Sequence, residues 1–331
     1  MRSISGPRIR DGINLLTFIN LRSLDCGPEV LFKQTPMKRS TIAIGCALAL
    51  LSVSCTEKSG WTELIDEELS QWRPYQSYTG DFRQGRRPVD ADGQVVEPVG
   101  YDVNLNDQWT VLEEGGELVI RNSGEYYGCL ATTQDYSNYH LQMQYRFGVA
   151  KYAPRAERTR DSGLQYHAVG ECGVRDPYFS WMTCNELQLM ESGTTEGEPG
   201  DYHSNAGATV DARCYGPVEG FFGKYVADPA GEWHTICPHG SWSYCAAEDF
   251  GSPYGEWTQL DLICFEDKAL HIVNGHVVMV LRNSRCWDGE KEVPLTAGKI
   301  ALQSEAAEFF YKNIRIRPIE SLPGEYAKYY E

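Results

Sequence analysis

The sequence predicts an all-β protein, folded as a two-sheet sandwich or jelly roll. Short segments in which apolar and polar residues alternate recur along the chain, separated by Gly, Pro and Asp. Helical periodicity is confined to one weak candidate, residues 63–69. The chain also carries 8 tryptophans and 20 tyrosines, which suit the wide interior between two sheets. A body of this size can form one domain.

The strand prediction is clearest at two hairpins. Residues 109–112 and 117–120 are rich in apolar residues and flank a turn that contains Gly-Gly. Residues 270–273 and 276–280 flank an Asn-Gly pair, which supplies the positive φ angles of a type I′ turn. Each pair of segments is therefore expected to form an antiparallel ladder.

Two longer segments alternate as half-buried strands do, residues 139–147 and 309–317. One face of the first is expected to hold Tyr139, Leu141, Met143, Tyr145 and Phe147. One face of the second is expected to hold Phe310, Lys312, Ile314 and Ile316. Long loops are expected at 148–161, 192–207 and 237–257, and loops of this length in a compact domain are often functional.

The N-terminus predicts an exported, lipid-anchored protein. A basic pair follows Met37, residues 41–51 are apolar, and small residues precede Cys55. This pattern resembles a bacterial signal peptide with a lipobox, in which Cys55 becomes acylated, although Ser52 stands where leucine is usual. An ordinary cleaved signal with an incidental cysteine is the alternative. We therefore expect a bacterial lipoprotein, periplasmic or at the cell surface, anchored to the membrane through Cys55.

This interpretation divides the chain into five parts. Residues 1–36 are expected to be an upstream extension from a start codon assigned too early, because the better signal begins after them. Residues 37–54 are the predicted signal peptide, and 55–60 a short tether. The folded domain is expected at 61–318, followed by a C-terminal tail at 319–331.

The net charge and the cysteine content indicate which partners and which cysteine chemistry to expect. The formal net charge is −16, and the segment before Cys55 is basic, so the mature protein is more acidic still. Such a surface repels nucleic acid, and no nucleic-acid partner is expected.

Eight of the 11 cysteines follow Cys55. An even number in an exported chain favours disulfides, whereas the absence of CxxC spacing argues against a zinc–thiolate site.

The most informative segment for function is residues 185–192. It reads as a β-strand in which Leu187 and Leu189 share one face, while Glu186 and Gln188 share the other. The two leucines suit a core. A carboxylate and an amide, about 7 Å apart along the strand at ~3.3 Å per residue, then point together toward a ligand cleft.

Blocks along nearly the whole body resemble one known family. Residues 161–166, Asp-Ser-Gly-Leu-Gln-Tyr, are similar to its NSGIFYR strand, and residues 186–191, Glu-Leu-Gln-Leu-Met-Glu, are similar to its EVQILD strand. Further matching blocks follow the family's order at residues 64–72, 109–120, 255–258, 274–275, 298–303 and 311–317. The family is the 3-keto-disaccharide hydrolase domain family, and the resemblance implies a concanavalin-like jelly roll that acts on carbohydrate.

The implied substrates are sugars oxidised at carbon 3. A 3-ketone acidifies the C2 proton, so a base can remove it to form an enolate. The glycosidic oxygen then leaves C1, and water adds to the resulting enone. The site needs a base with a pKa near neutrality and an electrophile for the enolate oxygen. A divalent cation is a possible cofactor, and no other is expected.

Candidate catalytic residues follow from this chemistry. Glu186 is the first choice, as general base or as metal ligand, and a carboxylate salt-bridged across strands is the structural alternative. His167 follows the block at 161–166 and is a candidate base, acid or ligand, although a lone histidine is often idle. Arg160 and Arg146 are candidates to stabilise an enolate, or to pair with surface carboxylates.

Substrate contacts are expected from Tyr166, Gln188, Gln303, Arg160 and Glu305. The family often continues Leu-Gln-Asp-His where this chain has Leu-Gln-Ser-Glu, so Glu305 is a candidate substitute for the histidine. Weaker candidates are His203 as a spare imidazole, and Trp181 and Trp242 as stacking platforms, since aromatic residues in sandwiches are mainly core.

Two other functions remain open. Glu186-x-Gln188-x-x-Glu191 is similar to the E-x-D-x-x-E signature of laminarinase-like retaining glycosidases, which makes Glu191 a second catalytic candidate. A regular strand puts Glu186 and Glu191 on opposite faces, some 16 Å apart at ~3.3 Å per residue, whereas retaining hydrolysis needs about 5–5.5 Å. A β-bulge would be required, and the central aspartate is absent. The third function is a non-catalytic carbohydrate-binding lipoprotein.

Overall fold

The computed structural model describes residues 60–79, 89–174, 180–220, 223–238 and 243–331. The predicted signal peptide, Cys55 and Trp242 lie outside these residues. Within them strands dominate, and the helical elements are short, as in η1 (Leu105–Asp107) and α1 (Gly324–Ala327). No helix in this part is long and apolar enough to cross a membrane. The all-β prediction is confirmed.

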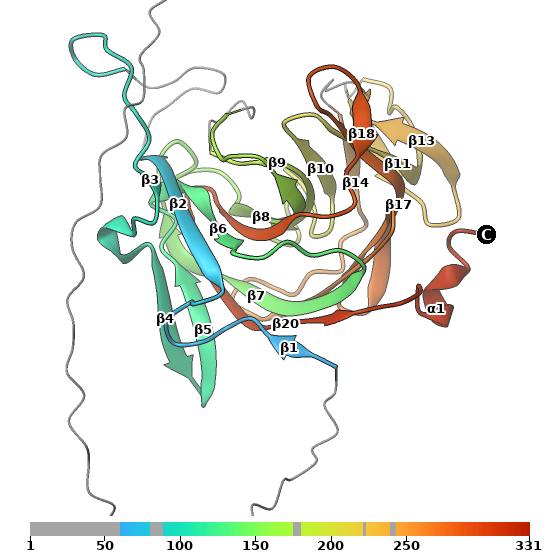
Figure 1. Ribbon diagram of the computed structural model, residues 1–331, viewed down its shortest axis with the longest axis horizontal. Coiled ribbons are helices and arrows are strands. Elements are labelled where there is room, and N and C mark those ends of the chain that lie inside the picture. Colours follow the sequence, from blue (N-terminus) through green and yellow to red (C-terminus); the bar gives the residue numbers. More distant parts are fainter. Residues whose placement is uncertain (1–59, 80–88, 175–179, 221–222, 239–242) are drawn as a thin grey trace, which may run out of the picture. The chain divides into compact units, whose positions relative to one another are not determined.

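The strands form two stacked layers, and one of them carries the candidate site (Figure 1). We call it the site layer. Neighbours in it pair in the order β3, β2, β6, β19, β8, β9 and β10. Its strands are β2 (Trp72–Thr79), β3 (Gly100–Tyr101), β6 (Tyr126–Thr132), β8 (Asp161–Val169), β9 (Thr183–Met190), β10 (Tyr202–Asn205) and β19 (Lys299–Ser304).

The second layer, the backing layer, lies beneath the first, and Figure 1 shows β7 and β20 curving below β6 and β8. Its strands are β1 (Thr62–Glu63), β4 (Trp109–Glu114), β5 (Glu117–Asn122), β7 (Tyr139–Lys151), β15 (Thr258–Phe265), β16 (Lys268–Val273), β17 (His276–Trp287) and β20 (Ala307–Pro318). Ladder hydrogen bonds continue between the layers at one end through β11 (Ala208–Tyr215), β12 (Lys224–Ala227), β13 (Glu232–Ile236) and β14 (Tyr244–Ala246), and β18 (Glu292–Pro294) extends β17.

The interior between the layers holds the apolar residues predicted for it. Tyr139, Leu141, Met143, Tyr145 and Phe147 are all buried in the main core cluster, as the alternation of this strand predicted. Polar side chains also join the layers. The Tyr166 hydroxyl lies 3.0 Å from His271 Nε2, and the Ser162 hydroxyl lies 3.1 Å from the Tyr311 hydroxyl. These bonds satisfy polar groups that burial would otherwise leave unpaired.

The predicted hairpins form as expected. Strands β4 and β5 pair antiparallel, and β16 pairs with β17 across Asn274 and Gly275. These two residues have φ angles of 47° and 82°, which a type I′ turn requires. The amide of Asn274 also donates to the Phe250 carbonyl at 2.7 Å, which ties the turn to the preceding loop.

The face assignment of β20 is wrong in its first half. Phe309 and Tyr311 are buried with Ile314 and Ile316, whereas Phe310 lies on the other side. The register against β7 shifts between Lys312 and Arg315, and Asn313 there has a φ of 54°. Such a β-bulge inserts one residue and reverses the alternation beyond it.

Three predicted irregular segments contain regular structure. Strand β7 continues through residue 151, into the expected loop at 148–161. Strand β10 lies within the expected loop at 192–207, and β14 within the one at 237–257. Residues 63–69 are not helical, because Asp66 accepts hydrogen bonds from nearby backbone amides and forms a turn instead.

The cysteines do not form the expected disulfides in the part of the chain that the structure describes. All eight that follow Cys55 are buried there as thiols, and several belong to the main core cluster, where they pack as small apolar groups. The sulfur atoms of Cys129 and Cys172 lie 3.5 Å apart, at hydrogen-bonding distance.

Candidate functional site

A polar cavity of about 250 Å³ opens on the face of the site layer that points away from the core. Glu186 and Gln188 both line it, as predicted from the alternation of their strand. Their side chains are 3 % and 7 % exposed. Polar neighbours therefore surround both groups, and a small part of each remains accessible to solvent. The cavity is lined by Arg155, Arg158, Asp161, Trp181, Glu186, Gln188, Glu196, Gly197, His203, Ser204, Asn205, Gln303 and Glu305.

Strand alternation delivers the two site residues on β9. Leu187 and Leu189 are fully buried in the core, which sends Glu186 and Gln188 to the opposite face. The pairing with β8 runs without a shift along this stretch, with Gln188 opposite Gly163 and Glu186 opposite Gln165. Regular pairing therefore fixes the direction of both side chains.

Gly163 makes room for the Glu186 carboxylate. A Cβ at position 163 would lie 2.5 Å from Glu186 Cδ and 2.7 Å from its Cγ and Oε1. Such distances are well inside van der Waals contact, so either the carboxylate or the strand would have to move. Glycine is thus required by the side chain beside it.

We expect Gly163→Ala to displace Glu186 and to lower the free energy of unfolding by about 1–3 kcal/mol. Gly324→Ala is the matched control, because a Cβ there meets nothing within 4 Å. Urea unfolding of both variants measures the effect. Equal stability of the two variants would mean that the contact between Gly163 and Glu186 is relaxed at little cost.

Three side-chain amides surround one oxygen of Glu186. Asn205 Nδ2 donates to Oε2 at 2.5 Å. Gln165 Nε2 and Gln303 Nε2 each lie 3.4 Å from the same oxygen. Burial, with a smaller contribution from the negative charge of Asp161, raises the pKa of Glu186 to about 7, although the bonds from Asn205 and Gln165 act in the opposite direction. The group can therefore exchange a proton near neutral pH.

A buried guanidinium holds the carboxylates at the other side of the cavity. Arg155 Nη2 lies 2.6 Å from Asp161 Oδ2, and Arg155 Nη1 lies 3.2 Å from Glu305 Oε1. Glu196 is 3.9 Å away. Despite Arg155, burial keeps the pKa of both Asp161 and Glu305 above its usual range. The cluster is thus an ion-pair network under strain from desolvation.

Several buried acceptors near Glu186 have no hydrogen-bond partner among the residues that the structure describes. They are the amide oxygens of Gln165, Gln188 and Gln303, and two of these residues line the cavity. The Gln188 amide nitrogen is already engaged by Asp161. Buried polar atoms are usually satisfied, so unpaired acceptors at a cavity indicate a ligand that brings hydrogen-bond donors.

A family model described as the 3-keto-alpha-glucoside-1,2-lyase-like domain matches residues 60–317. The chain belongs to this family. The resemblance found in the sequence is confirmed, and membership places the chain among carbohydrate-active, glycosyl-hydrolase-like jelly rolls.

Solved structures with similar folds have low sequence identity to this chain. A protein from Parabacteroides distasonis proposed to be a glycosyl hydrolase is 14% identical, with a TM-score of 0.41, over 78% of this chain and 99% of that one. A Bacillus licheniformis β-glucanase is 9% identical, with a TM-score of 0.34, over 78% and 97%. The carbohydrate-binding module CBM66 from Bacillus subtilis is 8% identical, with a TM-score of 0.34, over 63% and 95%. No curated protein matches.

Of the predicted site residues, the structure brings Glu186, Gln188, Gln303 and Glu305 to the cavity, together with the weaker candidates His203 and Trp181. The other described candidates lie elsewhere. Tyr166 points into the core, because it alternates with Gln165 along β8. His167 is 1 % exposed, and its Nδ1 lies 3.1 Å from the Leu295 carbonyl.

Glu191 and Arg160 also lie outside the cavity lining, where they pair with each other. Arg160 Nη1 is 3.2 Å from Glu191 Oε2, and its guanidinium lies 4.6 Å from the ring centre of Tyr254. Arg146 forms an ion pair with Glu114 at 2.7 Å. Both arginines therefore pair with carboxylates, which is the structural alternative that the sequence left open.

Sequence reasoning missed seven residues of the cavity lining: Arg155, Arg158, Asp161, Glu196, Gly197, Ser204 and Asn205. Asp161 had a usable signal, because it lies an even number of positions from Gln165 on the same strand face. Asn205 lies on β10, inside a segment expected to be a loop, and it reaches Glu186 only through strand pairing. Trp181, a weak candidate in the sequence, does line the cavity.

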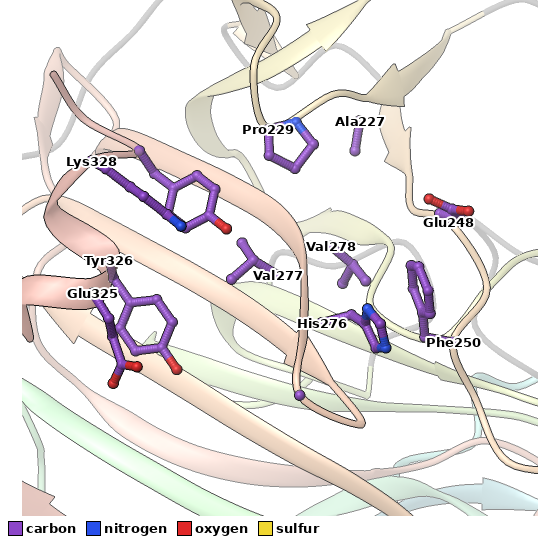
Figure 2. A pocket seen from close by; sticks show the side chains of 12 residues that line it. Ala227, Pro229, Glu248, Phe250, His276, Val277, Val278, Glu325, Tyr326 and Lys328 are labelled. Atoms are coloured by element: carbon purple, nitrogen blue, oxygen red, sulfur yellow. The ribbon is translucent and has the colours of Figure 1, made fainter.

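A larger cavity, of about 440 Å³, lies on another part of the surface, beside α1 (Figure 2). Figure 2 shows His276 next to Phe250, and the two rings stack 3.9 Å apart. Tyr326 and Lys328 face them across the opening. None of its lining carboxylates has the burial or the ion-pair network of the smaller cavity, so we place the site at Glu186.

The described residues contain no group of three or more His, Cys, Asp and Glu side chains arranged to hold a metal ion. At Glu186, the Oε2 atom already accepts a hydrogen bond from the side-chain amide of Asn205. A divalent cation stays a prediction, and no step below depends on it.

The buried carboxyl groups predict how stability changes with pH. Burial raises the pKa of Glu186 and of Asp201 to about 7. Between about pH 4 and 7 the unfolded chain loses these protons first, so the folded state loses stability as pH rises. Burial lowers the pKa of His167, His203 and His271 to about 4, and these groups act in the opposite direction below about pH 6.5. We therefore expect the thermal midpoint to fall from about pH 6.5 to about pH 8, and to fall less in Glu186→Gln. A midpoint that rises over this interval would contradict the burial of these groups.

Proposed function

We propose that this domain cleaves 3-keto-glycosides by elimination, with Glu186 as the general base. The observation that carries the proposal is a buried carboxyl with a pKa of about 7, placed in a polar cavity. A base of this pKa is ionised often enough at neutral pH to accept a proton, and basic enough to remove one. An ordinary surface glutamate is a much weaker base.

The cavity suits a sugar ring. Its volume of about 250 Å³ is small for a ligand site, which suits one ring better than a long oligosaccharide. The unpaired amide oxygens of Gln188 and Gln303 can accept hydrogen bonds from sugar hydroxyls. Trp181 adds an apolar wall. These features hold the sugar with its C2 hydrogen toward Glu186.

The reaction then follows from the ketone. Glu186 takes the C2 proton, and the electron pair of the C2–H bond forms an enolate with C3. The enolate collapses to the ketone, a C1=C2 double bond forms, and the C1–O bond breaks. The leaving oxygen takes a proton from water, Glu186 returns its own proton to solvent, and water adds to the enone in a later step. Each bond change is local to C1, C2 and C3.

Two alternatives fit the geometry less well. A laminarinase-like mechanism needs Glu186 and Glu191 on one face of the strand. Strand β8 pairs with β9 without a shift from the Asp161–Met190 pair to the Tyr166–Asn185 pair, so this stretch of β9 contains no bulge. Glu191 also forms an ion pair with Arg160. A non-catalytic carbohydrate-binding protein would not need the raised pKa of Glu186, although it would use the same unpaired amides.

The experiment offers the purified protein a glucoside and its 3-keto derivative, each with and without a chelator. We expect turnover of the keto sugar alone. Turnover of the plain glucoside would favour the glycosidase, and binding of either sugar without turnover would favour the binding protein. Loss of turnover with chelator would support the predicted divalent cation. Export and acylation at Cys55 remain predictions from the sequence.

A further inference from the structure

The proposed elimination leaves one role unassigned, the electrophile that holds the enolate oxygen. Removal of the C2 proton puts negative charge on the oxygen of C3, and a donor must meet it there. The two cations that line the cavity are already paired. Arg155 binds Asp161 and Glu305, and Arg158 lies 3.3 Å from Glu196.

His203 stands at the right place for this role. It is the cross-strand partner of Glu186, in the antiparallel pairing of β10 with β9. Directly opposed residues on a sheet have Cβ atoms about 5 Å apart and project to the same face. Both side chains line the cavity, so a ring bound between them can meet Glu186 and the imidazole together.

The orientation of the imidazole is fixed, and its ring nitrogens are available. The ring stacks on Tyr244 with the centres 5.2 Å apart and the planes within 11°. Among the described residues no side chain or carbonyl forms a hydrogen bond with a His203 ring nitrogen. By contrast, His167 and His271 each bind a backbone carbonyl in the core.

The protonation state of His203 also suits an electrophile. Burial lowers its pKa to about 4, so the ring is neutral at neutral pH and carries one N–H donor. A neutral imidazole is a poor base with this pKa. Its N–H is nevertheless a good match for an enolate, and a glutamate base beside a neutral imidazole donor is an established pairing in enolising enzymes.

We propose that His203 donates a hydrogen bond to the C3 oxygen of a 3-keto sugar while Glu186 removes the C2 proton. The proposal rests on the proposed function and names a further catalytic residue for it. The C2–H bond breaks, its proton goes to Glu186, and its electron pair becomes the C2=C3 bond of the enolate. The charge on the C3 oxygen is held by the N–H of His203, which keeps its own proton.

The test isolates the enolisation step with 1,5-anhydro-3-keto-glucitol, which has no glycosidic leaving group at C1. In deuterium oxide, exchange of its C2 hydrogen, followed by NMR, reports proton removal alone. We expect His203→Ala to slow this exchange by roughly 10²-fold or more, with a much smaller change in affinity for the ketone and an unchanged thermal midpoint. Added imidazole should restore part of the rate, which a merely structural role would not explain.

The matched control is His276→Ala, which removes the histidine of the larger cavity (Figure 2). It should exchange at the wild-type rate. His203→Gln keeps a hydrogen-bond donor of similar reach, so its exchange rate should lie between those of wild type and His203→Ala. This second variant keeps the inference testable if His203→Ala does not fold. If the wild-type protein exchanges the C2 hydrogen and both His203 variants exchange it equally fast, the inference is overturned and the proposed function stands. A wild-type protein without exchange or turnover would overturn both.

Discussion

Replacing Glu186 with glutamine is expected to lower kcat/KM on a 3-keto glycoside by roughly 10³-fold. The amide cannot accept the C2 proton, while its size and its contacts with Asn205 and Gln303 are preserved. Steady-state kinetics measure the loss. The thermal midpoint should not fall at neutral pH, because the substitution removes a buried carboxyl whose ionisation opposes folding.

Glu191→Gln is the matched control for this prediction. It makes the same chemical change five positions along the chain, at a residue that pairs with Arg160 outside the cavity. We expect kcat/KM to change by no more than about threefold, since no substrate contact is lost. Equal losses in the two variants would reverse our ranking and favour the two-carboxylate glycosidase.

Replacing Arg155 with methionine is expected to lower the free energy of unfolding by about 3–5 kcal/mol at neutral pH. Asp161 and Glu305 are 7 % and 6 % exposed, and without the guanidinium their charges are buried and uncompensated. Chemical denaturation gives the free energy. The loss should shrink at about pH 5, because protonation removes the charges that Arg155 balances.

Arg158→Met is the control for Arg155. Its side chain is 53% exposed, and its ion pair among the described residues is with Glu196, at 3.3 Å. An exposed pair of this kind contributes about 0–1 kcal/mol. A double variant of Arg155→Met with Glu305→Gln should be less destabilised than the sum of the single changes. Strict additivity would mean that the two groups do not interact as the distances indicate.

The sequence was sufficient for the fold class and for half of the site. The alternation of Leu187 and Leu189 with Glu186 and Gln188 needed only the period of a strand and the cost of burying charge. The turn at Asn274 was equally local, because its φ angles are a property of the residues themselves. Such features depend on neighbours in the chain.

Features that depend on distant neighbours were missed. The bulge at Asn313 reverses a pattern that looks continuous in the sequence, and nothing local marks it. Arg155 lies in an irregular basic segment, and its importance comes from Glu305, 150 positions away. Tyr166 and His167 belong to a matching block, yet strand alternation and the bulge near Tyr166 turn them from the cavity. Family blocks locate strands better than they locate side chains.

The place of β19 in the site layer has a consequence for how the protein matures. This late strand inserts between β6 and β8, and Ser162 binds the Gln303 carbonyl across 141 positions of sequence. Contacts this distant form slowly, because a long stretch of chain must be closed first. A nascent chain that has not yet released its last few dozen residues therefore holds an open slot beside Glu186. The proposed site around Glu186 is therefore complete only when synthesis is nearly complete.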